Sequence, residues 1–212
     1  MKRTKQITID PEKLDVEEFR KQMDEYEHNL RRIPKDESRS FRVLTNDPSL
    51  TAWGWAILNA SGEIIQAGCI KTKPEQKKRR IRKGDDNMRR INEINVMLRK
   101  LIEGYSVNYI LAELPHGSQN ASAARMIGMV AGMLQTISDW TDIAIEWYSE
   151  ADAKKAALGR ISATKAEMIA IMEIEYSNWR TLIKYKDEAI ADALAIHNVA
   201  MQQSPTLKFW KS

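Results

Sequence analysis

Two strand-like runs separated by a short turn occupy residues 41–58, and this pair restricts the possible folds more than any other feature. Phe41 to Asn46 is the first run, and Asp47-Pro48-Ser49 supplies turn residues directly after it. The second run, Thr51 to Leu58, places β-favouring side chains at alternate positions: Thr51, Trp53, Trp55 and Ile57. Alternation of this kind beside a turn predicts two antiparallel strands.

Asp47 stands where the first of these strands ends. A carboxylate at the end of a central strand adds little to packing and is held by a rigid scaffold, so it suits metal binding. Asp-Pro is also a common way to begin a turn, so the residue alone fits a turn-forming role equally well. The rest of the chain decides between these two interpretations.

The composition restricts the class of protein. A chain of 212 residues is long enough for one compact domain with an appendage. The net charge of +4 leans toward a polyanionic partner. The single cysteine, Cys69, excludes a disulfide framework and a zinc-thiolate cluster, and it fits a reducing compartment. No signal-like or membrane-spanning apolar run is present in the sequence, so we expect a cytoplasmic protein without membrane contacts.

Residues 1–40 form a separate N-terminal extension in this interpretation. Pro11 follows Asp10 as the first residue of a helix, and Pro34 ends the segment. A narrow apolar stripe runs along the predicted helix: Phe19, Met23, Tyr26 and Leu30. So thin a stripe must pack on the main body or on a second copy, and both remain open. We therefore divide the chain into an extension (1–40), a main domain (41–202) and a C-terminal tail (203–212).

A third strand, Glu63 to Ile70, follows a turn at residues 59–62 and completes an antiparallel meander. The chain then becomes strongly basic up to Gly84, and we call this segment the basic arm: Lys71, Lys73, Lys77, Lys78, Arg79, Arg80, Arg82 and Lys83. A charge run of this kind fits a solvated loop. It equally fits an arm that binds the phosphates of a nucleic acid.

The remaining pattern alternates helices with strands. Asn108 to Glu113 is a nearly continuous apolar run, as in a buried parallel strand, and it ends in a carboxylate. The other predicted elements are a strand at 142–147 and helices at 86–103, 120–134, 149–158, 164–175 and 186–200. This order predicts a mixed α/β fold, in which a meander leads into parallel strands flanked by helices. Asp47 and Glu113 then both stand at the carboxyl ends of strands, and their carboxylates converge at one crevice if the two strands are neighbours.

The last predicted helix supplies three more carboxylates, Asp187, Glu188 and Asp192. Glu188 and Asp192 are four residues apart and share one face, where their charges repel unless a cation lies between them. A solvated surface pair is the plainer interpretation. Together with Asp47 and Glu113, however, these oxygens suit Mg²⁺, with Mn²⁺ as a substitute. Two such ions about 4 Å apart can activate water and stabilise the leaving oxygen of a phosphodiester.

Several blocks of the chain, in this order, resemble the RuvC-type Holliday-junction resolvases of the ribonuclease H-like superfamily. The resemblance covers roughly residues 41–200, and four blocks carry it: Asn46 to Gly54, Ile110 to Glu113 with the small residues Ala124, Gly128 and Gly132 after it, Lys154 to Lys165, and Asp187 to Ala195. It implies a ribonuclease H-like mixed sheet with an acidic metal site. Residues 1–40 and the basic arm have no counterpart in that family pattern.

The resemblance implies that Asp47, Glu113 and Asp192 are metal ligands and catalytic residues. The family's fourth ligand usually lies three residues before the last aspartate, where this chain has Ala189. Glu188, which shares a face with Asp192, is the expected substitute, and Asp187 is the second choice.

The same resemblance places Lys154 and Lys165 beside the scissile phosphate, as a charge partner for the transition state and as a phosphate anchor. Ordinary solvated lysines are the alternative for both. His116, three residues after Glu113, could approach the nucleic acid, but a plain loop histidine is the favoured interpretation. His197 lies five residues from Asp192, off the acidic face, and is not expected to bind metal.

These expectations describe a Mg²⁺-dependent endonuclease of a bacterium or bacteriophage that cuts branched DNA, four-way junctions above all. Two symmetry-related cuts imply a homodimer, through the helix at 121–134 or the N-terminal helix. The alternative is a non-cleaving protein that binds branched nucleic acid and has a vestigial acidic site. An actin-like ATPase is disfavoured because the sequence has no second Gly-rich phosphate loop and is too short for two such lobes.

Overall fold

The computed structural model describes residues 41–75 and 81–211, together with Lys21 and Asp24. The helix predicted within residues 1–40 therefore lies outside the described residues apart from those two positions, as does the part of the basic arm at 76–80. Within the described ranges, no helix has the length and apolar character needed to cross a bilayer.

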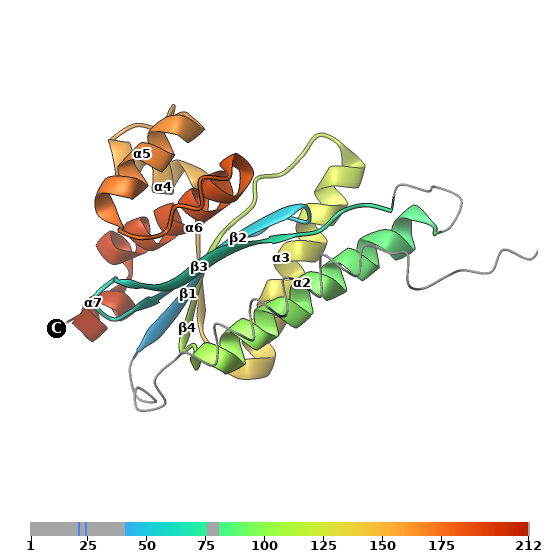
Figure 1. Cartoon of the computed structure of the whole chain (residues 1–212), viewed down its shortest axis with the longest axis horizontal. Coiled ribbons are helices and arrows are strands. Elements are labelled where there is room, and N and C mark those ends of the chain that lie inside the picture. The colour runs from blue at the N-terminus through green and yellow to red at the C-terminus, as the bar shows by residue number, and fades with distance from the viewer. Residues whose placement is uncertain (1–20, 22–23, 25–40, 76–80, 212) are drawn as a thin grey trace, which may run out of the picture.

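A mixed sheet forms the centre of the fold (Figure 1). Three strands build the antiparallel meander: β1 (Arg42–Asp47), β2 (Ala52–Asn59) and β3 (Ile64–Lys71). β4 (Tyr109–Glu113) pairs parallel to β1, and β5 (Ile145–Tyr148) pairs parallel to β4. The strand order is β3-β2-β1-β4-β5, so the predicted mixed sheet, with a meander leading into parallel strands, is confirmed.

Helices cover both faces of the sheet (Figure 1). One layer contains α2 (Lys83–Tyr105) and α3 (Ala121–Thr141). The other contains α4 (Glu150–Leu158), α5 (Lys165–Glu175) and the central α6 (Lys184–Gln203), which α7 (Pro205–Lys211) follows.

Each strand contributes to both apolar cores, because successive side chains of a strand point to opposite faces. Leu44 of β1 and Ile110 of β4 pack in the core that includes α2 and α3, whereas Val43 and Leu111 pack in the core that includes α6. Asp47 lies four residues after Val43, and Glu113 lies two residues after Leu111, so each points to the same face as the earlier residue. The two strand-end carboxylates therefore belong to the face that α6 covers.

α6 approaches the sheet unusually closely at Gly54 of β2. A Cβ atom added to Gly54 would lie 1.9 Å from the carbonyl oxygen of Ala189, so only glycine fits there. On β1, the buried Thr45 hydroxyl donates a hydrogen bond of 2.6 Å to the carbonyl oxygen of Ala193. These two contacts hold α6 against the strands immediately beside Asp47, which is the register partner of Gly54.

Two parts of the fold differ from the sequence-based expectation. α3 runs to Thr141 rather than ending at Leu134, because Ile137 continues its buried face into the core that includes α2. Asp142, predicted to begin a strand, instead ends α3 in the left-handed conformation. The segment predicted as a tail contains α7, whose Leu207 is buried.

Replacing Gly54 with alanine should destabilise the protein, because the new methyl group collides with backbone rather than with a flexible side chain. We expect a loss of roughly 1–3 kcal/mol of unfolding free energy, measured by chemical denaturation. Gly84→Ala, in the first turn of α2, is the matched control, since nothing lies within 4 Å of its added Cβ, and it should stabilise α2 by up to about 1 kcal/mol. Equal stability of Gly54→Ala and the unmodified protein would contradict the close approach of α6.

Candidate active site

Asp47 and Glu113 lie side by side at the carboxyl edge of the sheet. β1 and β4 are parallel, with Asn46 in register with Ala112, and the two acidic residues are the next ones along. Neighbouring strands are separated by about 4.8 Å, so the side chains of Asp47 and Glu113 leave the sheet as neighbours. Asn46 fixes this edge, because its side-chain amide donates to the Leu111 carbonyl and accepts from the Trp53 indole.

α6 adds Asp192 to this pair. The Thr45 bond to Ala193 holds the adjacent turn of α6 against β1, and Asp192 is only partly exposed there. The Lys165 ammonium, at the start of α5, donates to Asp192 Oδ2 over 2.5 Å. Four elements distant in sequence, β1, β4, α5 and α6, thus supply three carboxylates and one cation to one place.

The three carboxylates disturb one another's ionisation. Burial raises the pKa of Asp47 well above its ordinary value, and the charges of Asp192 and Glu113 raise it further. The pKa of Glu113 is raised to about 7 by burial, then by Asp192 and Glu150. Burial also raises the pKa of Asp192, although Lys165 opposes this. Ionising all three groups therefore requires more positive charge than Lys165 provides.

Glu150, at the start of α4, is a fourth acidic residue at this edge, and the sequence analysis did not select it. Its carboxylate pairs with Lys154 one turn along α4 and lies 3.4 Å from His116 Nε2. Its charge raises the pKa of all three site carboxylates. Its place in the sequence could have indicated this role, because Glu150 closely follows β5, the next parallel strand beyond β4. Lys154, paired with it, lowers the pKa of Glu113 and Asp192 and so belongs to the same region.

The two remaining acidic residues of α6 occupy different environments. Asp187 is buried, and burial alone would raise its pKa, but hydrogen bonds from Thr181 and Arg180 outweigh that and lower the pKa. Both of its oxygens are hydrogen-bonded in this way. Glu188 is partly exposed and contributes to raising the pKa of Lys165, so it lies toward the site. Ala189, beside it, is buried against Gly54.

The donor set suits a hard divalent cation, because carboxylate oxygens are the ligands that Mg²⁺ and Mn²⁺ prefer. Burial of mutually repelling carboxylates is the observation that favours a cation here. As they stand, no three His, Cys, Asp or Glu side chains in the described part of the chain form a ready-made metal-binding group. The Lys165 ammonium on Asp192 is the positive charge present in their midst.

Buried hydrogen bonds within the fold hold His197 and the described beginning of the basic arm. His197 is buried and shares a hydrogen bond of 2.8 Å between its Nδ1 and the Tyr176 hydroxyl, as expected of a residue off the acidic face. Arg90 of α2 is buried and donates to the hydroxyl of Thr72, at the start of the basic arm, and to the Leu50 carbonyl. α2 thereby fixes the described beginning of the arm beside the β1–β2 turn.

The sequence of the main domain is similar to that of a known protein family over nearly its whole length. The family model for crossover junction endodeoxyribonuclease RuvC matches residues 43–200. The chain belongs to the RuvC family. This confirms the resemblance that the sequence motifs indicated, and residues 1–42 and 201–212 lie outside the matched region.

Two RuvC proteins illustrate the relationship. The chain is 24% identical over 154 residues to crossover junction endodeoxyribonuclease RuvC of Orientia tsutsugamushi (strain Ikeda), covering 71% of this chain and 91% of that protein. It is 28% identical over 170 residues to the RuvC of Chlorobium phaeobacteroides, covering 76% of this chain and 86% of the relative.

The fold is also that of a solved RuvC structure. Thermus thermophilus RuvC in complex with Holliday junction substrate matches with a TM-score of 0.57 at 17% identity. The match covers 75% of this chain and 92% of the Thermus chain. The predicted ribonuclease H-like sheet with flanking helices is therefore confirmed.

The raised pKa of Glu113 predicts that the metal-free protein loses stability as pH rises. An unfolded glutamate ionises near pH 4.5, whereas the folded one resists until about pH 7. Glu113 therefore stabilises the fold fully below pH 4.5, and this contribution is lost as pH rises to 7. In EDTA, the free energy of unfolding measured by thermal denaturation should fall between pH 5 and pH 8, and Glu113 should account for on the order of 2 kcal/mol of the fall. The fall should be smaller in Glu113→Gln.

The exposed Glu175, on α5, provides the control, since Glu175→Gln should follow the unmodified protein at every pH. Millimolar Mg²⁺ at pH 8 should restore stability to the unmodified protein more than to Glu113→Gln. An identical pH dependence for Glu113→Gln and the unmodified protein would show that Glu113 is not buried beside like charges.

Proposed function

We propose that this RuvC-family protein is a divalent-metal-dependent endonuclease that hydrolyses phosphodiester bonds of branched DNA, four-way junctions above all. The observation that carries the proposal is the convergence of three partly buried carboxylates, from β1, β4 and α6, at one edge of the sheet. The related Thermus RuvC, described in complex with a Holliday junction substrate, supports the choice of DNA substrate. A cell compartment that holds DNA, the bacterial or phage-infected cytoplasm, fits this role.

Asp47, Glu113 and Asp192 would hold Mg²⁺, with Mn²⁺ as a substitute and Glu188 as the fourth carboxylate. Bound there, the cations supply a nucleophilic water and neutralise charge on the leaving oxygen. Glu188 is preferred to Asp187 because both oxygens of Asp187 are already hydrogen-bonded to Thr181 and Arg180. Each of these side chains is oriented by a strand or by α6, so little reorganisation is needed before reaction.

The two lysines have distinct tasks in this proposal. Lys165 now neutralises Asp192 through a 2.5 Å hydrogen bond. With Asp192 among the residues that would hold the cation, the Lys165 ammonium would hold the phosphate undergoing attack. Lys154 is held by Glu150 at the rim, where it meets the charge that develops on the phosphate oxygens.

The same electrostatics favour cleavage over binding by a vestigial site. Keeping three carboxylates together where each raises the pKa of another is costly to the folded state. A protein that only binds DNA gains nothing from that cost, because acidic side chains repel phosphates. The retained carboxylates therefore support a hydrolytic role.

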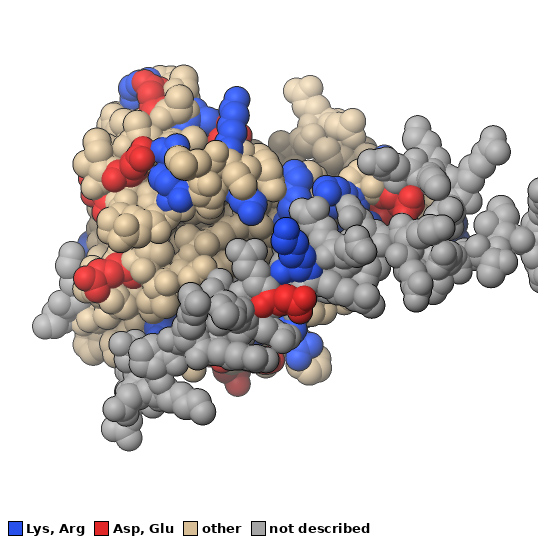
Figure 2. Space-filling model, viewed as in Figure 1, with Lys and Arg blue, Asp and Glu red and all other residues tan. Residues whose placement is uncertain are grey.

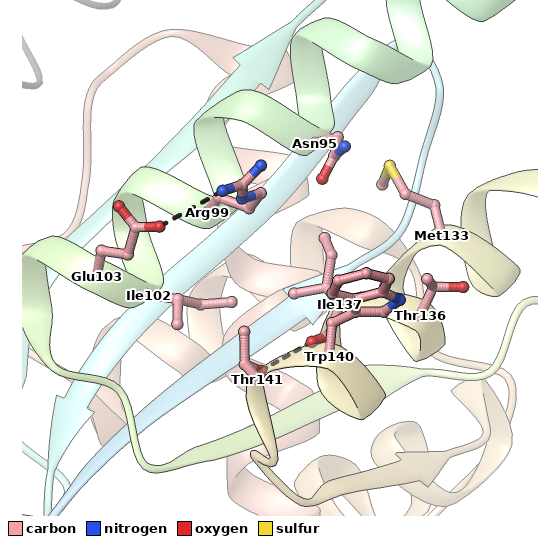
Figure 3. A pocket seen from close by; sticks show the side chains of 9 residues that line it. All are labelled: Asn95, Arg99, Ile102, Glu103, Met133, Thr136, Ile137, Trp140 and Thr141. Carbon is pink, nitrogen blue, oxygen red and sulfur yellow. Dashed lines mark hydrogen bonds and ion pairs between the residues drawn. The ribbon is translucent and has the colours of Figure 1, made fainter.

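We also propose a homodimer that uses the α2–α3 face. A groove of about 480 Å³ lies between the C-terminal halves of these helices, and Ile102, Ile137 and Trp140 border it (Figure 3). Trp140 is 86% exposed, which is unusual for so large an apolar side chain. α3 also exposes Gly128 and Gly132, which permit close approach of another helix. A twofold contact here would supply the two active sites that paired cuts need.

The central test replaces Asp47 with asparagine. We expect Mg²⁺-dependent cleavage of a synthetic four-way junction to fall at least about 100-fold, because the cation loses a charged ligand. Binding of the junction, measured by fluorescence anisotropy in Ca²⁺, should persist. Asp142→Asn is the control, since Asp142 is exposed, lies at the C-cap of α3 and has a left-handed backbone that asparagine tolerates. Undiminished cleavage by Asp47→Asn, or no cleavage by the unmodified protein, would refute the proposal.

The dimer is tested by Trp140→Glu, which places a charge in the centre of the proposed contact. Light scattering coupled to gel filtration should show a dimer for the unmodified protein and a monomer for the variant. Phe209→Glu makes the same change at another exposed aromatic residue, on α7, and should remain dimeric. If Trp140→Glu remained a dimer, the α2–α3 face would not be the interface.

A further inference from the structure

We infer that Leu182 and Ile183, in the loop between α5 and α6, form an apolar wedge that inserts between bases at the branch point of the DNA. The inference rests on the proposed function and adds to it the element that would distinguish branched from continuous duplex. The loop lies outside the acidic site, and none of the assigned roles uses it.

The wedge residues are exposed although nothing in their chemistry favours water. Leu182 is 86% exposed and Ile183 is 44% exposed. Leu182 also has a φ of 62°, in the left-handed region that a residue with a bulky side chain rarely occupies. A fold that holds an apolar side chain outward at the expense of backbone strain favours a binding role for that side chain.

Buried hydrogen bonds hold the loop in this conformation. Asp187, 2% exposed, accepts from the Thr181 backbone N–H at 2.8 Å and from its hydroxyl at 2.7 Å. Its second oxygen accepts from Arg180 Nε at 3.0 Å, and Arg180 is held in turn by Glu173. Leu182 therefore follows directly after a residue fixed to α6, and it is presented on a rigid support.

The charges around the wedge favour a nucleic acid over an apolar protein surface. Lys184 and Lys186 follow Ile183, and Lys71, where the basic arm begins, places its ammonium 4.5 Å from the centre of the Tyr185 ring. The N-cap of α6, Ile183, makes no side-chain capping bond, so the helix presents backbone N–H groups toward an anion. Lys and Arg side chains gather near the middle of the face seen in Figure 2. Apolar residues between phosphate-binding groups are typical of side chains that unstack bases.

The position of the wedge relative to the acidic site suits a cut near the branch point. α6 carries both features, with Ile183 at its N-cap and Asp192 nine residues further along. At 1.5 Å per residue the two are separated by roughly 13 Å along the helix. That corresponds to about four nucleotides at 3.4 Å each. A base step held open by the wedge would therefore set which phosphate reaches the carboxylates.

The experiment uses the full chain and a synthetic four-way junction with 2-aminopurine at the branch point, whose fluorescence rises when the base unstacks. Binding is followed in Ca²⁺ and cleavage in Mg²⁺. Leu182→Asn removes the apolar side chain with a residue that accepts the left-handed backbone, so thermal stability should be unchanged or higher. We expect loss of most of the fluorescence rise and about a tenfold slower cleavage, which corresponds to about 1.4 kcal/mol.

Two controls complete the design. Ile174→Asn makes the same exchange at another exposed apolar residue, on α5, and should behave as the unmodified protein. Leu182→Met keeps an apolar side chain and should retain the fluorescence rise. If Leu182→Asn unstacks and cleaves as the unmodified protein does, the wedge is refuted and the proposed function stands. If the unmodified protein neither binds nor cleaves the junction, the proposed function itself fails.

Discussion

The close contact of α6 with β1 and β2 is the constraint on which the rest of the structure depends. Gly54 admits the Ala189 carbonyl where any side chain would collide, and Thr45 donates to the Ala193 carbonyl one turn further along. Both contacts are made to the backbone of α6, so they fix the position of the helix rather than of one side chain. Asp192 is adjacent to the second contact, and Asp47 is the register partner of Gly54. The contacts that pack α6 on the sheet therefore also set the positions of Asp47 and Asp192 in the site.

The site opposes the stability that this packing provides. Burial raises the pKa of Asp47, Glu113 and Asp192, so each resists ionisation in the folded protein. Lys165 relieves part of the repulsion by its hydrogen bond to Asp192, and Lys154 is already committed to Glu150. In the proposed function, this imbalance of charge would favour the binding of divalent cations without a closed cage of ligands. It is also the reason that the sheet must hold the strand ends rigidly.

Much of this could be predicted from sequence, because strand ends and helix faces follow from local pattern. The apolar runs before Asp47 and Glu113 predict parallel strands that end together, and the register of Asn46 with Ala112 places them so. Three-dimensional partners could not be predicted. Asp187 looks like a ligand in sequence, but Thr181 and Arg180 occupy its oxygens. Glu150 belongs to the site only because β5 lies beside β4, and the need for glycine at position 54 appears only once α6 is in place.

The most direct test of the account is a crystal structure of the full chain soaked in Mn²⁺, with anomalous diffraction used to locate the ions. The account predicts at least one Mn²⁺ coordinated by oxygens of Asp47, Glu113 and Asp192, at about 2.1 Å, with the Lys165 ammonium displaced from Asp192. An anomalous map with no ion among these three carboxylates, or with Lys165 still bound to Asp192 at saturating Mn²⁺, would contradict it.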